Sequence, residues 1–495
     1  MMNRLIALPL ASFLLATTMQ AQTAATPSRD SLQRVVRQRV EAGKTTGMIL
    51  GVISPAGTSF HVAAGNERAG KPIDDQTLFE IGSITKAFTG VLLAEMAARG
   101  EVRFDQPVGE LLPAGTNVPE RGGRAITLAD LATQSSGLPR LPGNMQPADP
   151  SNPYADYTPQ LLYAFLAQHQ LRRDPGAQYE YSNLGVGLLG HALALRAGAS
   201  YEGLLRERVL APLGLTNTSI VLTPAMRARM SEGHDGAGTV VPLWDLPTLA
   251  GAGALRSSLR DMMKVASALV TPPPNAVGSA IVQSVAPRFT ANQALSIGLG
   301  WHRVILAGDT VVFHNGGTAG FRTYIGMNVR TRAAVVMLTN SGHDNEDLAR
   351  HVLAPQLPLV AVVKRTEITL PRDVLSQYVG RYPLTPQFSL TIALADRGLT
   401  LQATGQPVFP LFAEARDRFF LKVVDAQVEF TRDSTGQVTG VVLVQNGGRM
   451  PGIRQREPVD TTLLGVDSLW ARNYATHDTV RAMQLMSDDF LGRAE

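Results

Sequence analysis

The chain of 495 residues contains no cysteine. That absence excludes disulfide bonds, catalysis by a thiol, a thiolate metal site and lipid modification of an N-terminal cysteine. A surplus of one charge is also lacking, because 45 basic residues stand against 41 acidic ones and the net charge is only +4, without a conspicuous basic run. We therefore expect no nucleic-acid partner. With 44% hydrophobic residues, the chain is long enough for one large core and a second module.

No long hydrophobic run is evident either, and a short one lies at the N-terminus. A basic lead, Met1–Arg4, precedes an apolar stretch over residues 5–16 that then turns polar. This pattern is typical of a signal peptide, and the apolar run is too short to span a bilayer comfortably as an anchor. We predict a signal peptide over residues 1–21, with cleavage after Ala25 as the alternative. The protein is then exported, periplasmic or secreted, without a stable membrane anchor after cleavage.

Strands precede helices in the next part of the sequence. Residues 31–41 have helical spacing, and two apolar runs, 47–53 and 60–64, bracket a Pro/Gly turn and predict a hairpin. A helical stretch that begins at Ser83 follows. This order is typical of an α/β or α+β enzyme domain.

Ser83 and Lys86 form the first cluster with catalytic potential. They open an apolar helical run and stand three residues apart, so a helix places the ammonium on the face that carries the hydroxyl. A serine becomes a useful nucleophile when a neighbour removes its proton and a helix N-terminus stabilises the oxyanion. Ser-x-x-Lys alone is a weak signal, because two fixed letters in four recur by chance and Lys86 could equally be a solvated helix residue.

A proline-rich segment follows, with six prolines between residues 139 and 159. It predicts a long loop, and loops of that length in a compact domain are usually functional. We predict that this loop forms a wall of the substrate cleft, with a plain surface excursion as the alternative.

Tyr181 and Asn183 form the second cluster. Tyr181 offers a phenol that acts as a general base if a nearby cation lowers its pKa, and Asn183 offers an amide that both donates and accepts. The plain alternative is a packing ring and a helix N-cap. Glycines 185, 187 and 190 then spell G-x-G-x-x-G, but a loop precedes them and helical sequence follows, so the pattern indicates close helix packing and not a dinucleotide site.

His314, Gly316 and Gly317 form the third cluster, where an apolar strand runs into a glycine-rich turn. Glycines let the backbone approach a bound acyl group, and the Gly317 N–H is a candidate second oxyanion donor beside the Ser83 N–H. We expect His314 to point into the cleft, as the only one of nine histidines in such a setting. None of the others forms a metal-ligand pair, so we predict no metal and no cofactor.

The three clusters, in this order, resemble the motifs of serine hydrolases of the class C β-lactamase and D-alanyl-D-alanine carboxypeptidase superfamily, which includes penicillin-binding proteins. The supporting stretches 79–82, 131–139 and 251–258 are also similar. Family members carry Ser-x-x-Lys, Tyr-x-Asn and Lys- or His-x-Gly, and the matching positions here are Ser83, Lys86, Tyr181, Asn183, His314 and Gly316. The resemblance implies a hydrolase domain over residues 28–362, with an α/β (α+β) architecture in which helices flank an antiparallel sheet beside an all-helical lobe.

The resemblance also implies acyl transfer through a covalent ester of Ser83. The serine proton would pass to the coupled pair of Lys86 and Tyr181, and which of the two is the formal base stays open. Tyr181 would then protonate the leaving group, and Asn183 would bind the side-chain amide of the substrate. His314, Gly316 and Gly317 would complete the substrate-binding residues. The implied partner is a small peptide, β-lactam or ester substrate.

His314 departs from the class C β-lactamases, which carry a lysine there to hold the substrate carboxylate. A histidine near its reference pKa is mostly neutral at pH 7 and binds a carboxylate less firmly. We therefore expect a D-aminopeptidase or a peptidase like the D-alanyl-D-alanine carboxypeptidases. A β-lactamase or carboxylesterase of the same fold is the alternative, and a non-catalytic penicillin-binding sensor is a third possibility. The sequence does not indicate an oligomeric state.

The remaining sequence predicts two further parts. Residues 366–455 alternate apolar and polar positions between turns and predict a small antiparallel β-barrel-like domain. Its opening, residues 378–382, is similar to lipocalin-like domains appended to such hydrolases, and we favour a bracing role over ligand binding. Residues 456–495 predict a helical tail that resembles the start of a truncated SnoaL-like domain, with a plain docking helix as the alternative.

Overall fold

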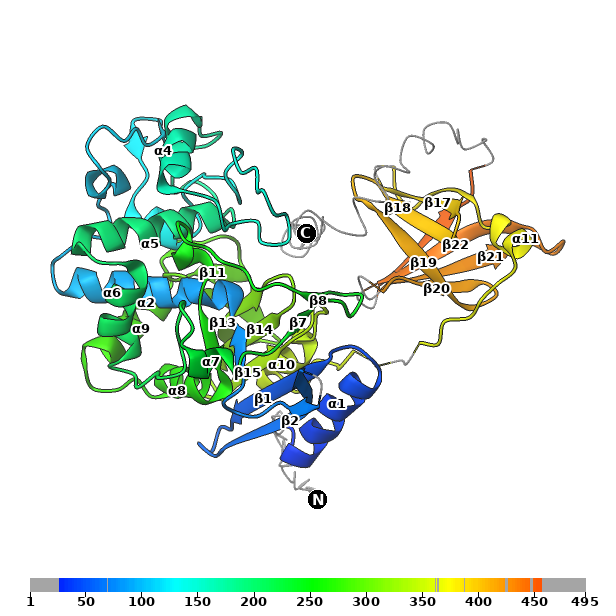
Figure 1. Ribbon diagram of the computed structural model, residues 1–495, viewed down its shortest axis with the longest axis horizontal. Coiled ribbons are helices and arrows are strands. Elements are labelled where there is room, and N and C mark those ends of the chain that lie inside the picture. Colours follow the sequence, from blue (N-terminus) through cyan, green and yellow to red (C-terminus); the bar gives the residue numbers. More distant parts are fainter. Residues whose placement is uncertain are drawn as a thin grey trace, which may run out of the picture.

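The computed structural model describes residues 26–455 apart from residues 69, 361, 363, 364, 387, 423–425 and 446–447. The predicted signal peptide and the predicted helical tail, residues 456–495, lie outside the described residues. Two parts with separate hydrophobic cores follow one another along the chain (Figure 1). The helices are α1 (Arg29–Glu41), α2 (Thr85–Ala98), α3 (Leu128–Ala132), α4 (Pro159–Gln168), α5 (Asn183–Ala197), α6 (Tyr201–Leu205), α7 (Pro224–Arg227), α8 (Leu259–Val270), α9 (Ala276–Val285), α10 (Glu346–Leu353) and α11 (Arg372–Ser376), with short turns η1 (Gly82–Ile84), η2 (Val108–Leu111), η3 (Arg206–Leu210) and η4 (Ala250–Ala252).

A nine-stranded antiparallel sheet forms the centre of the first part, in the order β10-β11-β12-β13-β14-β15-β1-β2-β3. Strand β1, from the start of the domain, pairs with β15 from its end, and Ile49 lies opposite Leu338. The strands are β1 (Gly47–Ile53), β2 (Ser59–Arg68), β3 (Lys71–Pro72), β10 (Phe289–Thr290), β11 (Leu295–Ile297), β12 (His302–Leu306), β13 (Asp309–Gly317), β14 (Arg322–Asn328) and β15 (Ala334–Thr339).

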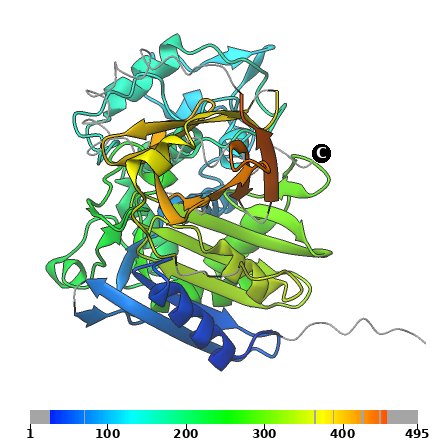
Figure 2. The same ribbon diagram turned by 90° about the vertical axis from the view of Figure 1, so that its right-hand side faces the viewer.

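Both faces of this sheet are covered by helices. Because side chains alternate along a strand, Met48 and Leu50 of β1 enter a core with α1 and α10, whereas Ile49 enters the core that includes α8. Figures 1 and 2 show α1 lying beside β1 and β2. All seven residues of β1 are buried, as expected for a strand covered on both faces.

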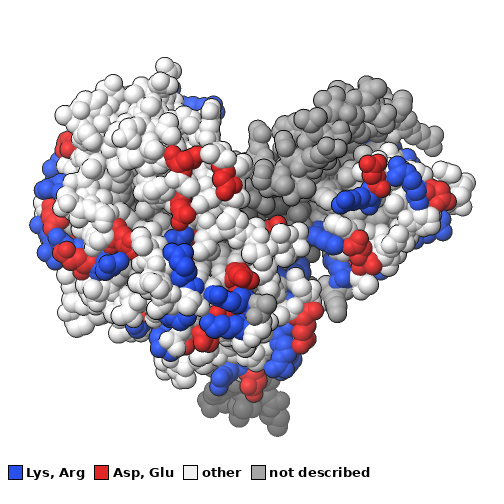
Figure 3. All heavy atoms as spheres, viewed as in Figure 1, with Lys and Arg blue, Asp and Glu red and all other residues white. Residues whose placement is uncertain are grey.

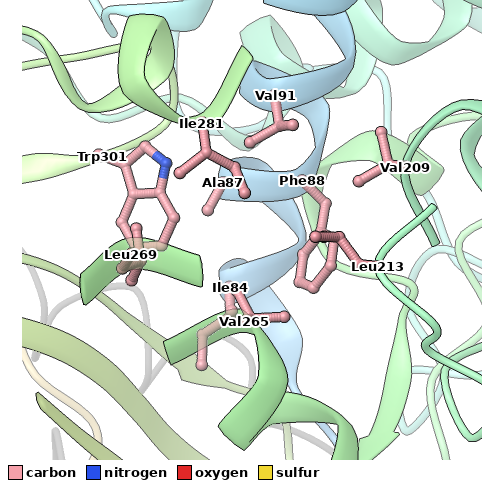
Figure 4. Close-up of a pocket in the computed structure, with 10 residues that line it drawn as sticks. All are labelled: Ile84, Ala87, Phe88, Val91, Val209, Leu213, Val265, Leu269, Ile281 and Trp301. Carbon is pink, nitrogen blue, oxygen red and sulfur yellow. The ribbon is translucent and has the colours of Figure 1, made fainter. Parts of the chain in front are cut away.

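Helix α2 is buried from Thr85 to Met96 and runs through the helical lobe. Figure 4 shows Ile84, Ala87, Phe88 and Val91 on one side of it, facing apolar side chains that include Trp301. These residues line a cavity of about 10 Å³ with no polar surface, which is a packing void and not a substrate site. Short antiparallel pairs join segments of this part: β4 (Leu78–Glu80) with β9 (Arg256–Ser258), β5 (Glu120–Arg121) with β6 (Arg124–Ala125), and β7 (Gly233–His234) with β8 (Val240–Val241).

Glycines allow two segments to contact the central helices closely. A Cβ on Gly90 of α2 would lie 1.9 Å from the carbonyl oxygen of Leu299. A Cβ on Gly187 of α5 would lie 2.7 Å from the Leu249 side chain, and one on Gly190 would lie 3.0 Å from Cα of Gly251. The prediction that the G-x-G-x-x-G glycines serve close helix packing is therefore confirmed for Gly187 and Gly190.

The second part is an eight-stranded antiparallel sheet in chain order. A bridge between Arg381 and Gln455 joins its two ends, so the sheet is a nearly closed barrel. Tyr378 and Tyr382, from the predicted opening motif, are buried in its core with Phe430. The strands are β16 (Gly380–Pro383), β17 (Ser389–Ala395), β18 (Gly398–Ala403), β19 (Val408–Ala415), β20 (Arg418–Phe420), β21 (Ala426–Arg432), β22 (Val438–Gln445) and β23 (Gly448–Ile453).

The predicted fold class is confirmed in both parts: helices flank an antiparallel sheet in the first, and the second is a small β-barrel. On the face drawn in Figure 3, basic and acidic side chains are interspersed. Among the described residues, no helix is long and apolar enough to cross a membrane.

We expect Gly90→Ala to destabilise the first part of the chain. The new methyl group would clash with the Leu299 carbonyl and separate α2 from the segment that leads to Trp301. Overpacking of this kind lowers the free energy of unfolding by about 2–3 kcal/mol. Urea denaturation followed by tryptophan fluorescence measures the loss.

Gly109→Ala is the matched control, because its Cβ would meet Val118 at an ordinary 3.6 Å. We expect that control to stay within about 0.5 kcal/mol of the unsubstituted chain. Equal losses in the two variants would contradict the packing argument.

Candidate active site

Ser83 lies in the one-turn helix η1, directly before α2. Gly82 has a φ of +49° and lies against Gly317 at the end of β13, where a Cβ would be 2.8 Å from the Gly317 nitrogen. A Cβ on Gly316 would lie 2.0 Å from the carbonyl oxygen of Ile81. The turn that carries Ser83 and the glycine-rich end of β13 are thus in direct backbone contact, which side chains at these glycines would prevent.

Lys86, one turn along α2, is completely buried. Its Nζ lies 3.0 Å from Ser83 Oγ, 2.8 Å from Asn183 Oδ1 and 2.7 Å from the Ala252 carbonyl oxygen. The amide oxygen and the carbonyl oxygen can only accept hydrogen bonds, whereas a hydroxyl can also donate. A neutral amine can therefore donate to Asn183 and Ala252 and keep its lone pair for the Ser83 hydroxyl.

The environment shifts the pKa values of Lys86 and Tyr181 in opposite directions. Burial lowers the pKa of Lys86 well below its usual range, and the positive charge of Arg140 lowers it further. Burial raises the pKa of Tyr181 to about 12, although a hydrogen bond with Ser83 and the charge of Arg140 partly oppose this. The lowered phenol pKa required for Tyr181 to act as the base is therefore absent, and Tyr181 is a neutral phenol at neutral pH.

Asn183 is the first residue of α5, and the N-cap is its neighbour Ser182, whose hydroxyl accepts from the Gly185 N–H. The Asn183 amide bonds Lys86 through its oxygen and donates from Nδ2 to the Tyr154 hydroxyl at 3.1 Å. Both ends of the amide thus have partners within the chain. The reading of this residue as a mere N-cap is wrong.

The proline-rich loop reaches the site at two positions. Tyr154 is buried beside Asn183, and its ring lies 5.6 Å from that of Trp244. Arg140 places its guanidinium 5.2 Å from the centre of the Tyr181 ring, and Lys86 Nζ lies 4.9 Å from the same point. The loop is therefore part of the site, and the reading as a plain surface excursion is wrong.

His314 is buried beside Tyr181, with ring centroids 6.3 Å apart, and is only 1% exposed. Its Nδ1 lies 2.6 Å from the Asn315 carbonyl oxygen, and its Nε2 is buried without a partner among the described residues. Burial lowers the pKa of His314 well below its usual value, and the proximity of His302 and Lys86 adds to this. The ring is therefore neutral at neutral pH.

The expectation that His314 is the only histidine in this setting is wrong, because His302 of β12 lies beside it. The two rings are 5.0 Å apart, and the His302 ring is stacked on that of Tyr181 at 6.2 Å. His302 Nε2 is hydrogen-bonded to the Tyr179 hydroxyl at 3.0 Å. Burial, with a smaller effect from Lys86, lowers the pKa of His302 to about 4.

Glu80, three residues before Ser83, links two segments of the chain next to the candidate site. It pairs with Arg256 across β4 and β9 and accepts from the Trp244 N–H at 2.8 Å. Burial raises the pKa of Glu80 to about 7, against the opposing charge of Arg256. The two supporting sequence stretches before Ser83 and around residue 256 thus meet in one small sheet.

All seven predicted site residues gather in one region: Ser83, Lys86, Tyr181, Asn183, His314, Gly316 and Gly317. Sequence reasoning missed Tyr154, Arg140 and His302. The loop prediction pointed to the first two only as a segment, and His302, the first residue of β12, belongs to no recognisable catalytic motif. No group of three potential metal ligands occurs within the part of the chain that the structure describes.

A protein-family profile described as Beta-lactamase matches residues 32–356, and one described as a domain of unknown function, DUF3471, matches residues 364–450. The D-alanyl-D-alanine-carboxypeptidase/endopeptidase AmpH of Escherichia coli K12 is 32% identical over 222 residues, which cover 44% of this chain and 56% of that protein. A Beta-lactamase of the same strain is 28% identical over 371 residues, covering 67% and 94%. The chain thus spans little more than half the length of the first of these relatives.

Solved structures agree in fold. A β-lactamase/D-alanine carboxypeptidase from Yersinia pestis, complexed with citrate, has a TM-score of 0.56 at 25% identity and covers 66% of this chain and 98% of its own. The corresponding protein of Pseudomonas syringae has a TM-score of 0.57 at 22% identity over 66% of this chain and 99% of its own, which shows the shared fold alone. The family itself is confirmed by the profile, which matches more than half of the chain, and the named relatives agree with the predicted class of enzyme, a serine hydrolase.

The buried histidine pair predicts a loss of stability in acid. In the unfolded chain His302 takes up a proton near pH 6.5, whereas in the fold its pKa is about 4, so the unfolded state binds more protons between these values. Stability therefore falls as the pH drops through this window. Between pH 7 and pH 4.5 the free energy of unfolding should fall in both the unsubstituted chain and His302→Phe. We expect the fall to be smaller in His302→Phe by about 2–3 kcal/mol.

Urea denaturation at the two pH values measures this difference. Replacing the exposed His61 by phenylalanine is the matched control and should keep the acid sensitivity of the unsubstituted chain. Identical acid losses in His302→Phe and the unsubstituted chain would contradict a neutral buried His302.

Proposed function

The chain belongs to the Beta-lactamase family, and we propose that it is a peptidase of this family that cleaves small D-amino-acid peptides through an acyl-enzyme on Ser83. The observation that carries this proposal is the hydrogen bonding of Lys86: its Nζ lies 3.0 Å from the Ser83 oxygen, while its other two partners accept only. A buried amine in that position is suited to take the serine proton.

In the proposed acylation, Ser83 Oγ attacks the carbonyl carbon of the substrate, and its proton passes to Lys86 Nζ. The lowered pKa of Lys86 supports this amine as the base, in preference to Tyr181. The oxyanion that forms would accept hydrogen bonds from the Ser83 and Gly317 N–H groups, whose backbones lie together.

The C–N bond then breaks, and the leaving amine takes a proton from the Tyr181 hydroxyl. That phenol is a suitable donor because its pKa of about 12 keeps it protonated. The ammonium of Lys86 returns the proton to Tyr181. Water next attacks the ester carbonyl and gives a proton to the same pair of residues. The pair passes that proton to Ser83 Oγ as the ester C–O bond breaks, which releases the acid and regenerates the Ser83 hydroxyl. Asn183, held by Lys86 and Tyr154, orients the base and borders the position of the substrate amide.

His314 favours a peptidase over a β-lactamase within this family. A neutral, buried ring supplies no fixed charge for the carboxylate of a penicillin, which a lysine at this strand position would hold. The relative named AmpH carries the name of a carboxypeptidase and endopeptidase. A β-lactamase or carboxylesterase is the second candidate. The Escherichia coli K12 relative that matches 67% of this chain is named Beta-lactamase.

Export to the periplasm or the medium is part of the proposal and depends on residues 1–21. The β-barrel over residues 366–455 is proposed to brace the enzyme, since its interior is filled by its own apolar side chains.

We expect Ser83→Ala to lower kcat for D-alanine release from acetyl-D-alanyl-D-alanine by at least about 10⁴-fold, because no other group replaces the nucleophile. Intact-protein mass spectrometry after mixing with benzylpenicillin should find an adduct on the unsubstituted chain and none on Ser83→Ala. The exposed Ser59→Ala is the matched control and should keep full activity and adduct formation.

The same two assays separate the candidates. Rapid loss of benzylpenicillin would indicate a β-lactamase, and turnover of a simple p-nitrophenyl ester alone would indicate an esterase. A stable adduct without release of D-alanine would indicate a penicillin-binding sensor. Substantial hydrolysis by Ser83→Ala would overturn the acyl-enzyme mechanism itself.

A further inference from the structure

The end of β13, where His314 lies, supplies no positive charge to the candidate site. His314 is enclosed between Tyr181 and His302, its Nδ1 is engaged by the Asn315 carbonyl, and burial keeps the ring neutral. Lys86 is fully occupied by Ser83, Asn183 and Ala252. A substrate carboxylate at this site therefore needs another cation.

Arg140 has the required properties. Its guanidinium lies over the Tyr181 ring, and its charge is close enough to act on Lys86, Tyr154 and Tyr179. Within residues 26–455 as described, neither an ion pair nor a side-chain hydrogen bond engages this guanidinium. The residue is half-buried, so its cation is partly withdrawn from water while it still has unused donors. A guanidinium with free N–H groups binds a carboxylate through two parallel hydrogen bonds.

The backbone around Arg140 holds it in place. Its carbonyl oxygen accepts from the N–H groups of Asn183 and Leu184 at the start of α5. The preceding residue, Pro139, accepts from the Ser182 hydroxyl at 2.7 Å. The base of the side chain is therefore fixed to the same helix turn that presents Asn183 to Lys86.

Arg322 is a rival, because it lies beside Gly317 at the other edge of the site. Its Nη1 already donates to the carbonyl oxygens of Thr318 at 2.7 Å and Phe321 at 2.9 Å. The negative charges of Asp344 and Glu346 also act on it. The Arg322 guanidinium therefore already has hydrogen-bond acceptors and negative charges close to it, whereas the Arg140 guanidinium has none of these among the described residues.

We propose that Arg140 binds the carboxylate of the substrate and so replaces the charge that the His314 strand lacks. The ligand class is an acyl compound with a free carboxylate near the reacting carbonyl. The C-terminus of a peptide is the expected source, because the charge comes from the loop and not from the strand of His314, and the acid group of a β-lactam is the alternative that the ligand pairs below distinguish. This inference rests on the proposed function of Ser83, but binding tests it without turnover.

The test measures equilibrium binding by titration calorimetry to the full chain carrying Ser83→Ala. Two ligand pairs differ only in charge: acetyl-D-alanyl-D-alanine against its C-terminal amide, and benzylpenicillin against its methyl ester. We expect the acid of at least one pair to bind roughly 10- to 100-fold more tightly than its neutral partner, as for a charge-assisted hydrogen-bonded pair. Adding Arg140→Gln should remove that preference and leave the affinity for the neutral partner within about twofold.

Two matched variants complete the experiment. Arg140→Lys should retain part of the preference, because it keeps the charge and loses the planar fork. Arg172→Gln, an exposed arginine beyond the proline-rich loop, should keep all of it.

The outcomes decide between the alternatives. No preference for either acid in the Ser83→Ala chain would overturn the proposal, and so would an equal loss of acid and neutral ligand in Arg140→Gln, which would indicate a structural role. A preference that survives Arg140→Gln and disappears in Arg322→Gln would assign the carboxylate to Arg322 instead. Failure of the proposed peptidase activity would show as absent D-alanine release from the unsubstituted chain, a separate measurement that leaves the binding result intact.

Discussion

The burial of Lys86 is the constraint on which the rest of the site depends. A completely buried amine must find partners for its hydrogen-bonding groups, and Lys86 finds them in Ser83, one turn away, and in Asn183 and Ala252 from two distant parts of the chain. Loss of any one partner would leave a polar group unsatisfied in the core. The same burial lowers the pKa of Lys86, which suits the amine to the proposed role of base. Structural and chemical requirements therefore coincide in a single side chain.

Close backbone contacts bring those parts together. Gly90 admits the segment that ends in His302, and Gly82 and Gly316 admit the end of β13 against the turn of Ser83. Gly251 is packed between α2 and α5, which places the neighbouring Ala252 carbonyl at Lys86. Each contact requires the absence of a Cβ, so glycines far from the chemistry determine its geometry.

Burial and nearby charges give the ionisable groups of the site different protonation states. Burial makes both histidines neutral and keeps the Tyr181 phenol protonated. Lys86 and Arg140 are left as the basic side chains next to Tyr181, the first a buried amine with a lowered pKa and the second a half-buried guanidinium on the loop. This arrangement fits the proposals that proton transfer falls to Lys86 and anion binding to Arg140.

The sequence by itself determined the motif residues, the family and the order of the elements. Helical spacing placed Lys86 one turn after Ser83, and the alternation of apolar and polar positions over residues 366–455 predicted an antiparallel β domain where the barrel lies. These are properties of neighbouring residues, so local patterns suffice.

Only the tertiary structure decided which residues meet across the site. Tyr154, Arg140 and His302 lie in segments whose own sequence has no catalytic pattern, and they reach Asn183, Tyr181 and His314 through long-range packing. The protonation states could not be predicted from the sequence either, because the desolvation of an ionisable group depends on every element that surrounds it. A sequence states which ionisable side chains exist, whereas burial, which only the fold creates, decides which of them carry charge.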